Sequence, residues 1–560
     1  MVTTPELPDT EIRVIQFLLI APRPPQDADF AGFDYGGASR VTRVAPAAIA
    51  TIAAFAPSGV RPILLDESIE EVCLEACCDY VGITANIAQL PRALTLAHAF
   101  RARGKIVIVG GPHATLDPDA FDGACDVLVT GEFEGIAAGF YADLLSGALK
   151  PRYDGGRADM ATSPAPAWEL YPNERALIGV VQTSRGCPFE CNFCDVIQYV
   201  GRVQRHKTNA QVIGEVQKLY DLGYNNIQIA DDNFTVYRRR ATSLLEALCA
   251  WNGRNGRDFV MFGTQISVDI ANDDAVLALC AEAGLTNLFV GIESVNEASL
   301  KASGKRQNLV GDLGGRVRNI VRHGIDVTAA LMLGFDPDTL DIFERQYSFG
   351  AELPVATFKV SVLTAPVATP LHAQMMAAGR LISSDHAGIF PSAELTTNII
   401  PAQMSREELY VGTRWLISRL FHPRAFLHRL DTACAVLTPN PLFARGRYYN
   451  PPARALSARL FMRMMRDMAR RDPAIAGALA RVSERMRQRP DIAFSLQIML
   501  QNWLLALNGH IQRGSYDPAW GDMPRPPFHL ASARSTTPAA IFEGTGQAAF
   551  PGSPAVATAL

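Results

Sequence analysis

The sequence predicts an α/β protein in which two successive series of parallel strands are followed by a mostly α-helical region. Three observations predict this fold class. Short apolar runs alternate with helical stretches over residues 12–145, the same alternation resumes at residue 177, and helical patterns dominate beyond residue 405. Such alternation is typical of parallel sheets covered by helices. The predicted divisions are a domain at 1–150, a linker at 151–176, a domain at 177–395, a helical domain at 396–531 and a tail at 532–560.

The first series predicts a doubly wound parallel sheet. Its strands are expected at five apolar runs, which are 14–20, 62–65, 80–84, 106–110 and 127–130. A proline-rich connector at 163–172 separates this sheet from the second series.

The second series predicts six units of a strand and a helix, which make a partial barrel of the TIM type. Its strands are expected at 177–183, 227–230, 260–266, 287–292, 327–333 and 358–363. Polar side chains follow several of these strands, namely Asp231, Asp232, Gln265, Glu293 and Ser294. Adjacent residues at a strand end point to opposite sides, so at most one of the two aspartates is expected to face the cavity.

The C-terminal region is predicted to be helical. Ser405 and Glu408 have the spacing of a helix capping box. Polar residues interrupt the apolar stretch 492–511, which predicts a buried helix and no membrane span. The arginine-rich stretch 455–490 is interpreted as a solvated face over a methionine-lined core, with peripheral contact to an anionic lipid or substrate as the alternative. The tail from residue 532 has no periodicity and is predicted to be disordered.

Composition indicates a large cytoplasmic protein. The 560 residues carry a formal net charge of -4, which gives no indication of nucleic-acid binding. The ten cysteines are sparse, and the N-terminus has no basic and then apolar signal sequence. These features predict a reducing compartment.

Three cysteines within eight residues are the most informative feature of the chain. Cys187, Cys191 and Cys194 form a Cys-x3-Cys-x2-Cys loop at the end of the first strand of the second series. Three thiolates can hold three irons of a 4Fe-4S cluster and leave the fourth iron open to another ligand. The alternatives are a structural zinc site, which needs four closed ligands and could take His206 as the fourth, or simple packing.

This loop resembles the signature of the radical S-adenosylmethionine (SAM) superfamily, including Phe193 before the third cysteine. The resemblance implies that SAM chelates the open iron and is cleaved to a 5'-deoxyadenosyl radical. It implies cofactor contacts from Phe193 and from Glu293 and Ser294, of which the last two resemble the ribose- and methionine-contacting motif. Asp231 and Gln265 are expected to contact the cofactor as well, because they lie at neighbouring strand ends. By resemblance, Lys305, or Arg306 beside it, neutralises the SAM carboxylate, although a solvated helix lysine is an equal alternative for Lys305.

The first domain resembles the cobalamin-binding domain that precedes many radical SAM cores, on segments 107–115 and 126–134. Within that resemblance, Thr84, Gly110 and Gly111 accommodate the nucleotide tail of cobalamin. The chain departs from the Asp-x-His-x-x-Gly pattern, because residues 35–44 contain no histidine. The alternative is a domain that binds no cobalamin and only packs on the core.

Further segments resemble the hopanoid C2-methylase group of class B radical SAM enzymes, namely 332–346, 363–372, 396–401 and 421–426. This resemblance covers roughly residues 60–430. It implies a methyltransferase that takes a methyl group from one SAM through cobalamin and activates an unactivated substrate carbon with a second SAM. The loop at 366–370 departs from the usual Pro-x-Gly-Thr, which leaves cofactor orientation or substrate open.

The expected partners are a small-molecule, lipid or natural-product substrate and an electron donor such as flavodoxin or ferredoxin. Two alternatives stay open. One is a radical SAM enzyme that catalyses aminocarboxypropyl transfer, rearrangement or oxidative cyclisation, with or without cobalamin. The other is a non-catalytic iron-sulfur protein.

Overall fold

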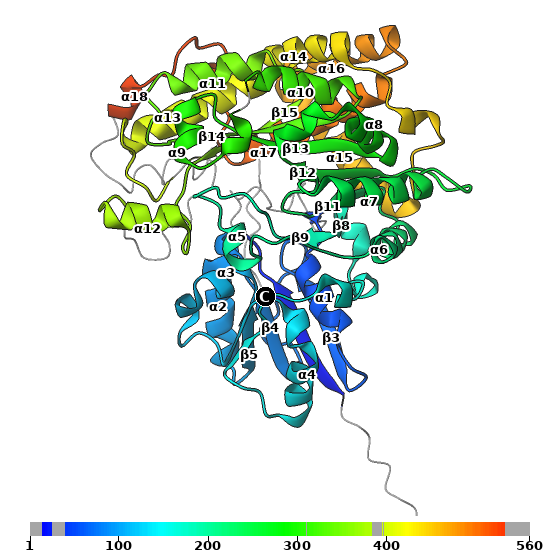
Figure 1. Cartoon of the computed structure of the whole chain (residues 1–560), viewed down its shortest axis with the longest axis vertical. Coiled ribbons are helices and arrows are strands. Elements are labelled where there is room, and N and C mark those ends of the chain that lie inside the picture. Colours follow the sequence, from blue (N-terminus) through cyan, green and yellow to red (C-terminus); the bar gives the residue numbers. More distant parts are fainter. Residues whose placement is uncertain (1–13, 25–39, 310, 383–394, 396, 533–560) are drawn as a thin grey trace, which may run out of the picture.

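Two large parallel sheets, a two-stranded antiparallel sheet and a helical layer make up the part of the chain that the structure describes (Figure 1). The computed structural model describes residues 14–24, 40–309, 311–382, 395 and 397–532. The tail predicted to be disordered lies, apart from its first residue, outside the described residues. The N-terminal sheet lies at one end of the molecule, and the second sheet with the C-terminal helices lies at the other.

The N-terminal sheet is parallel throughout, in the order β3-β1-β4-β5-β6-β7. Its strands are β1 (Ile15–Ala21), β3 (Val60–Asp66), β4 (Tyr80–Thr84), β5 (Ile106–Gly110), β6 (Val127–Thr130) and β7 (Arg152–Asp154). Its helices are α1 (Ala47–Ala54), α2 (Leu90–Arg101), α3 (Pro112–Leu116) and α4 (Ala137–Ser146). Apolar side chains occupy both faces, as expected for a sheet with helices on each side. The predicted doubly wound sheet is therefore confirmed.

The segment predicted as a linker is packed structure. Strand β7 extends the N-terminal sheet past residue 150, and Trp168 is fully buried. The backbone N–H of Ala167 donates to the carbonyl of Ala50 in α1. Three-residue strands and short turns carry too little periodicity to be read from sequence, so the domain boundaries from sequence stay a prediction.

The second sheet is an open, partial barrel in the order β15-β14-β13-β12-β11-β8-β2. The six predicted strands are present as β8 (Ala176–Val181), β11 (Asn226–Ile229), β12 (Met261–Ile266), β13 (Leu285–Glu293), β14 (Asp326–Leu333) and β15 (Thr357–Val362). The helices of these units are α6 (Asn209–Asp221), α7 (Arg238–Trp251), α8 (Asp274–Ala283), α9 (Glu297–Ala302), α10 (Leu313–Arg322), α11 (Ile342–Ala351) and α12 (Pro370–Ala377).

The seventh strand, β2 (Thr42–Val44), was not predicted. It belongs by sequence to the first domain, yet it pairs in parallel with β8 of the barrel. The N-terminal segment thus crosses to the barrel sheet before it returns to its own sheet through α1. Such a short pairing between distant segments is set by tertiary packing, which a local pattern does not contain.

The C-terminal region is helical, as predicted, and packs on the barrel (Figure 1). Its helices are α13 (Arg406–Phe421), α14 (Pro423–Val436), α15 (Ala455–Arg471), α16 (Pro473–Gln488), α17 (Ala493–Gln512) and α18 (His529–Ser532). The capping box is confirmed, because Ser405 Oγ accepts from the N–H of Glu408 and the Glu408 carboxylate accepts from the N–H of Ser405. Helix α17 is the predicted buried helix and stacks Trp503 on Phe426 at 4.2 Å between ring centroids. None of the helices in the described ranges has the length and hydropathy needed to cross a membrane.

A buried carboxylate joins α17 to the barrel. Asp326, at the start of β14, accepts from the side-chain amides of Asn502 and Asn287 and from the N–H of Val327. Burial raises the pKa of Asp326 to about 6, against these hydrogen bonds, which lower it. The stabilising contribution of this group is therefore complete below about pH 4 and is lost as the pH rises through 6.

As the pH rises from about 5 to 7.5, we expect the parent protein to lose more unfolding free energy than Asp326→Asn. The difference should be on the order of 1 kcal/mol, because the variant has no proton to release at this position. Urea unfolding followed by tryptophan fluorescence measures this difference. Asp119→Asn, at an exposed site in the N-terminal domain, is the control and should keep the parental pH dependence. An unchanged pH dependence in Asp326→Asn would contradict the assignment.

Candidate active site at the junction of the two sheets

The three cysteines lie on a loop that follows β8, held between two short strands. These strands, β9 (Ser184–Arg185) and β10 (Arg205–His206), pair antiparallel and flank the loop, and α5 (Val196–Tyr199) follows the third cysteine. Gly186 has φ 106, and a Cβ there would lie 2.5 Å from the carbonyl oxygen of Val203. Glycine is therefore required at the turn into the first cysteine. In Figure 1, β9 and α5 lie between the two sheets.

Two adjacent carboxylates support the base of this loop. Asp231 is buried and accepts from the N–H and hydroxyl groups of Thr183 and Ser184, at 2.5 to 2.9 Å. Asp232 accepts from the N–H of Gly186 at 2.7 Å. Both side chains thus hydrogen-bond the strand that leads into the cysteines, and the cofactor contact of Asp231 stays a prediction.

Cys191 is buried and the other two cysteines of the loop are half-buried, and the thiols are near enough to interact by charge. Burial raises the pKa of all three cysteines, that of Cys194 to about 12, while Lys305 lowers the pKa of Cys187 and Cys191. The charge of the Cys191 thiolate also raises the pKa of Cys187 and of Cys194. The thiolate is the form that binds metal, and burial disfavours this charged form. Bound iron would supply the positive charge that stabilises the thiolates. Three thiols on one loop fit a cluster with one open iron.

Among the described residues, no three or more His, Cys, Asp or Glu side chains are already arranged around one metal position. His206, the candidate fourth zinc ligand, lies edge-on against Tyr237 with ring centroids 5.9 Å apart. Burial, together with the charge of Arg240, lowers the pKa of His206 to about 4. The ring is thus engaged in packing.

An ion pair stands beside the cysteine loop. Lys305 Nζ lies 2.6 Å from Glu293 Oε1, and the two side chains are only 12% and 9% exposed. The alternative of a solvated helix lysine is therefore wrong for Lys305. A bulge in the pairing of β13 with β14 gives Glu293 a positive φ of 64, a conformation that is rare outside glycine and is often found at functional sites. A Cβ on Gly291 would lie 2.6 Å from Glu293 Oε1, so this glycine makes room for the pair.

The other predicted contacts have different surroundings. Ser294 is fully buried and its hydroxyl accepts from the N–H of Asn296. Gln265 is exposed at the end of β12. Phe193 packs edge-on against Phe335, with ring centroids 6.2 Å apart. These placements leave their SAM contacts as predictions.

Gln307 was missed by the sequence reasoning. Its side-chain amide donates to Cys191 Sγ at 3.8 Å. No motif indicated it, because its only signal is a position two residues after Lys305. Hydrogen bonds to ligating sulfurs are one means by which proteins tune iron-sulfur clusters.

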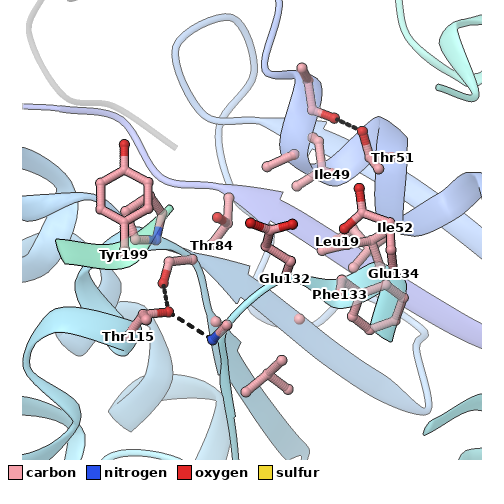
Figure 2. Close-up of a pocket in the computed structure, with 18 of the residues that line it drawn as sticks. Leu19, Ile49, Thr51, Ile52, Thr84, Thr115, Glu132, Phe133, Glu134 and Tyr199 are labelled. Atoms are coloured by element: carbon pink, nitrogen blue, oxygen red, sulfur yellow. Dashed lines mark hydrogen bonds between the residues drawn. The ribbon is translucent and has the colours of Figure 1, made fainter. Parts of the chain in front are cut away.

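A cavity of about 340 Å³ lies at the carboxyl edge of the N-terminal sheet, beside the cysteine loop (Figure 2). The predicted residues Thr84, Gly110 and Gly111 all line it. Much of its lining is apolar and includes Phe17, Leu19, Ile52, Ile108, Val129 and Phe140. Its lining also includes residues of the barrel strands and of the segment around the cysteine loop, which are Val180, Gln182, Arg185, Tyr199, Val200 and Ala230. One cavity therefore contacts both the N-terminal sheet and the segment that carries the cysteines.

Gly111 is required by the backbone at this cavity. Its φ of 103 and ψ of -176 belong to a region that is essentially restricted to glycine. A Cβ there would lie 2.7 Å from Thr84 Oγ1 and 2.9 Å from the backbone of Ala85. Thr115, which the sequence reasoning missed, donates to the carbonyl of Gly111 and accepts from the N–H of Gly131, as Figure 2 shows.

A second cavity, of about 210 Å³, shares Pro112 and Tyr199 with the first. It is also lined by Asp195, directly after the third cysteine, and by Pro366 and Val367 of the loop that follows β15. The altered loop at 366–370 therefore forms part of this chamber. The two cavities together extend from the N-terminal sheet to the cysteine loop.

The fold and the site define an enzyme that combines a partial barrel, a three-cysteine cluster loop and an N-terminal parallel sheet of the ligand-binding type. Residues 181–349 match the model of the radical SAM superfamily, and residues 369–472 match a domain of unknown function (DUF4070). The chain belongs to the radical SAM superfamily. Its cofactors accordingly include a 4Fe-4S cluster and SAM.

Sequence similarity to known proteins extends over most of the chain. It is 30% identical over 399 residues to the uncharacterized methyltransferase sll1242 of Synechocystis, which covers 69% of this chain and 72% of the relative. It is 29% identical to the hopanoid C-2 methylase of Rhodopseudomonas palustris, over 69% of this chain and 73% of the relative. The fold is similar to that of the cobalamin-dependent radical SAM enzyme OxsB, with a TM-score of 0.56 and 13% identity over 93% of this chain and 84% of OxsB.

Proposed function

We propose that the chain is a cobalamin-dependent methyltransferase that uses radical SAM chemistry to alkylate an unactivated carbon of a small, largely apolar molecule. The observation that carries the proposal is the cavity shared between the N-terminal sheet and the segment of the cysteine loop. When bound, the cluster would supply the electron that cleaves SAM, and cobalamin would carry the methyl group. The names of the relatives sll1242 and hopanoid C-2 methylase support methyl transfer.

The residues of the first cavity fit a flat, partly apolar ligand. Gly110 and Gly111 leave the sheet edge without side chains, so that a ligand can approach the backbone closely. Thr84 offers a hydroxyl group at the same edge, while the hydroxyl of Thr115 holds Gly111 and Gly131 together. No histidine, cysteine or methionine is among the described residues that line the cavity, in agreement with the missing Asp-x-His-x-x-Gly pattern. Cobalamin held there would have its lower face against side chains that are not strong cobalt ligands.

The second cavity is the proposed site of the substrate. It lies between α3 and the residue that follows the third cysteine, and much of its lining is apolar. Its apolar residues are Ile87, Pro112, Leu116, Pro366 and Val367. This lining supports an apolar substrate, and its closeness to the cluster loop supports a reacting carbon that is held away from water. An acidic electron carrier such as flavodoxin or ferredoxin would supply the electron.

The test is incubation of the reconstituted protein with methyl-labelled SAM, a reductant and candidate apolar substrates. We expect labelled product, S-adenosylhomocysteine and 5'-deoxyadenosine. Methylthioadenosine would indicate aminocarboxypropyl transfer, and 5'-deoxyadenosine with an unlabelled product would indicate rearrangement or cyclisation. Absence of the cobalamin absorption bands after incubation with excess cobalamin would refute the methyl-carrier step.

Lys305 provides a test of the SAM position. We expect Lys305→Met to raise the KM for SAM about tenfold or more, because a buried cation beside the cluster loop would neutralise the SAM carboxylate. SAM cleavage at varied SAM concentrations measures this change. Lys301→Met is the matched control, since Lys301 is 63% exposed in its i,i+4 pair with Glu297. A KM equal to that of the control would show that Lys305 does not bind SAM.

A further inference from the structure

An ion network connects the N-terminal sheet to the strands that flank the cysteine loop. Arg185 Nη1 donates to Glu132 Oε2 at 2.9 Å, and its Nη2 donates to Glu134 Oε1 at 2.7 Å. Arg205 binds both carboxylate oxygens of Glu132, at 2.7 Å through Nη1 and also through Nη2. We call these four residues the interdomain clamp.

The clamp is buried and has further polar partners. Its side chains are 3% to 19% exposed. The N–H of Ala158 donates to Glu132, and the hydroxyl of Ser163 donates to Glu134. Burial would raise the pKa of Glu134, but the Arg185 guanidinium and the hydrogen bond from Ser163 hold it below its usual value. The pairs are thus charged and sheltered from the solvent that weakens surface ion pairs.

The two carboxylates are fixed by the backbone beneath them. A Cβ on Gly135 would lie 2.3 Å from the carbonyl oxygen of Gly155, and a Cβ on Gly131 would lie 2.5 Å from the N–H nitrogen of Gly156. The loop after β6 is therefore packed directly on the segment after β7. Glu132 and Glu134 therefore have little freedom to move unless the whole loop moves.

The clamp lies between the two functional parts of the site. Glu132 and Glu134 line the cavity at the sheet edge and are labelled in Figure 2. Arg185 lines the same cavity and is two residues before Cys187. Arg205 is paired with Arg185 across the β9 and β10 ladder. A shift of the N-terminal sheet relative to the cysteine loop would have to break these bonds.

We propose that the interdomain clamp positions the ligand cavity of the N-terminal sheet relative to the cluster loop, and so couples SAM cleavage to methyl transfer. These four residues act as positioning residues. Misplacement of about 1 Å between reacting groups is enough to lower a rate about a hundredfold. For its product readout, this inference rests on the proposed function.

The test uses Arg205→Gln in the protein reconstituted with cluster and cobalamin. Arg205 does not line either cavity described above, so its loss acts through its hydrogen-bond partners, which are the Glu132 carboxylate and the backbone carbonyls of Val200 and Ala158. We expect the number of methylated products per 5'-deoxyadenosine to fall about tenfold or more, while SAM is still cleaved. Arg205→Lys keeps the charge and should recover part of the coupling.

Arg103→Gln is the matched control, because Arg103 forms an ion pair with Glu75 on the surface of the N-terminal domain, where Glu75 is 79% exposed. It should leave the product ratio unchanged. A parallel fall of cleavage and methylation in Arg205→Gln would overturn the proposal and leave the clamp a support of the cluster loop only. An unchanged ratio would overturn it as well.

Hydrogen exchange of the same holoenzymes separates this proposal from the proposed function. We expect faster exchange in Arg205→Gln at both 131–135 and 184–187, with no change in Arg103→Gln. Unchanged exchange at either segment would overturn the positioning role of the interdomain clamp. If the parent protein makes no methylated product under any condition, the proposed function fails while the exchange result still decides on the clamp.

Discussion

Cys191→Ala is expected to reduce SAM cleavage below about one thousandth of the parental rate, a loss of at least ~4 kcal/mol of transition-state stabilisation. Cys191 is the most buried of the three cysteines, with 8% exposure. Its sulfur receives a hydrogen bond from Gln307 and lies in the field of Lys305. A cluster with two remaining cysteine ligands on the loop would be lost or displaced. The visible absorbance of the reconstituted cluster and the yield of 5'-deoxyadenosine measure the effect.

The loop itself should stay folded in this variant. The N–H of Asn192 donates to the carbonyl of Ser303, and the N–H of Leu371 donates to the carbonyl of Asn192. These bonds do not involve the thiol. Cys434→Ala in α14 is the matched control and should keep both the cluster and the activity. SAM cleavage by Cys191→Ala at the rate of this control would refute the cluster assignment.

Gly111→Ala is expected to have the largest effect on the N-terminal domain. The substitution forces an L-residue into a backbone region used almost only by glycine, and its Cβ would overlap Thr84 Oγ1 and the backbone of Ala85. The cost is at least about 2 kcal/mol of unfolding free energy, since strain and overlap add. Any relief would move Thr84 at the cavity edge and should weaken cobalamin binding about tenfold or more. Urea unfolding and spectroscopic titration with cobalamin measure the two effects.

Gly110→Ala is the control for this substitution. Its Cβ would approach no atom nearer than 3.4 Å, which is ordinary contact with Val129, and Gly110 has no positive φ. It should lower stability by less than about 1 kcal/mol. An equal loss of stability in the two substitutions would show that the conformation of Gly111 is not the reason for glycine at this position.

Much of the architecture was predictable, because its signals are local. All eleven strands expected from apolar runs are present, since a strand buried on both faces needs a continuous apolar run wherever it lies in the chain. The cysteine loop was equally readable from its spacing. By contrast, β2 has three residues and its partner β8 begins at Ala176. A pairing so short and so distant leaves no local pattern.

The candidate site was predictable in its residues and less so in their roles. Thr84, Gly110 and Gly111 line one cavity, as the resemblance implied. Asp231, by contrast, uses its carboxylate to hold the strand before the cysteines. Lys305 could not be assigned from sequence, since nothing in its neighbours distinguishes a buried lysine from a solvated one. Its pair with Glu293 depends on the bulge in β13.

By itself, the sequence determined that this chain contains two parallel sheets and a loop able to hold a 4Fe-4S cluster, because hydrophobic period and cysteine spacing are properties of neighbouring residues. Only the tertiary structure decided that Thr84 and Gly111 share a cavity with Arg185 of the cluster strand. It alone decided that Glu132 pairs with Arg205, 73 residues away. Such contacts depend on how two sheets pack together, and burial then determines which charges must find a partner.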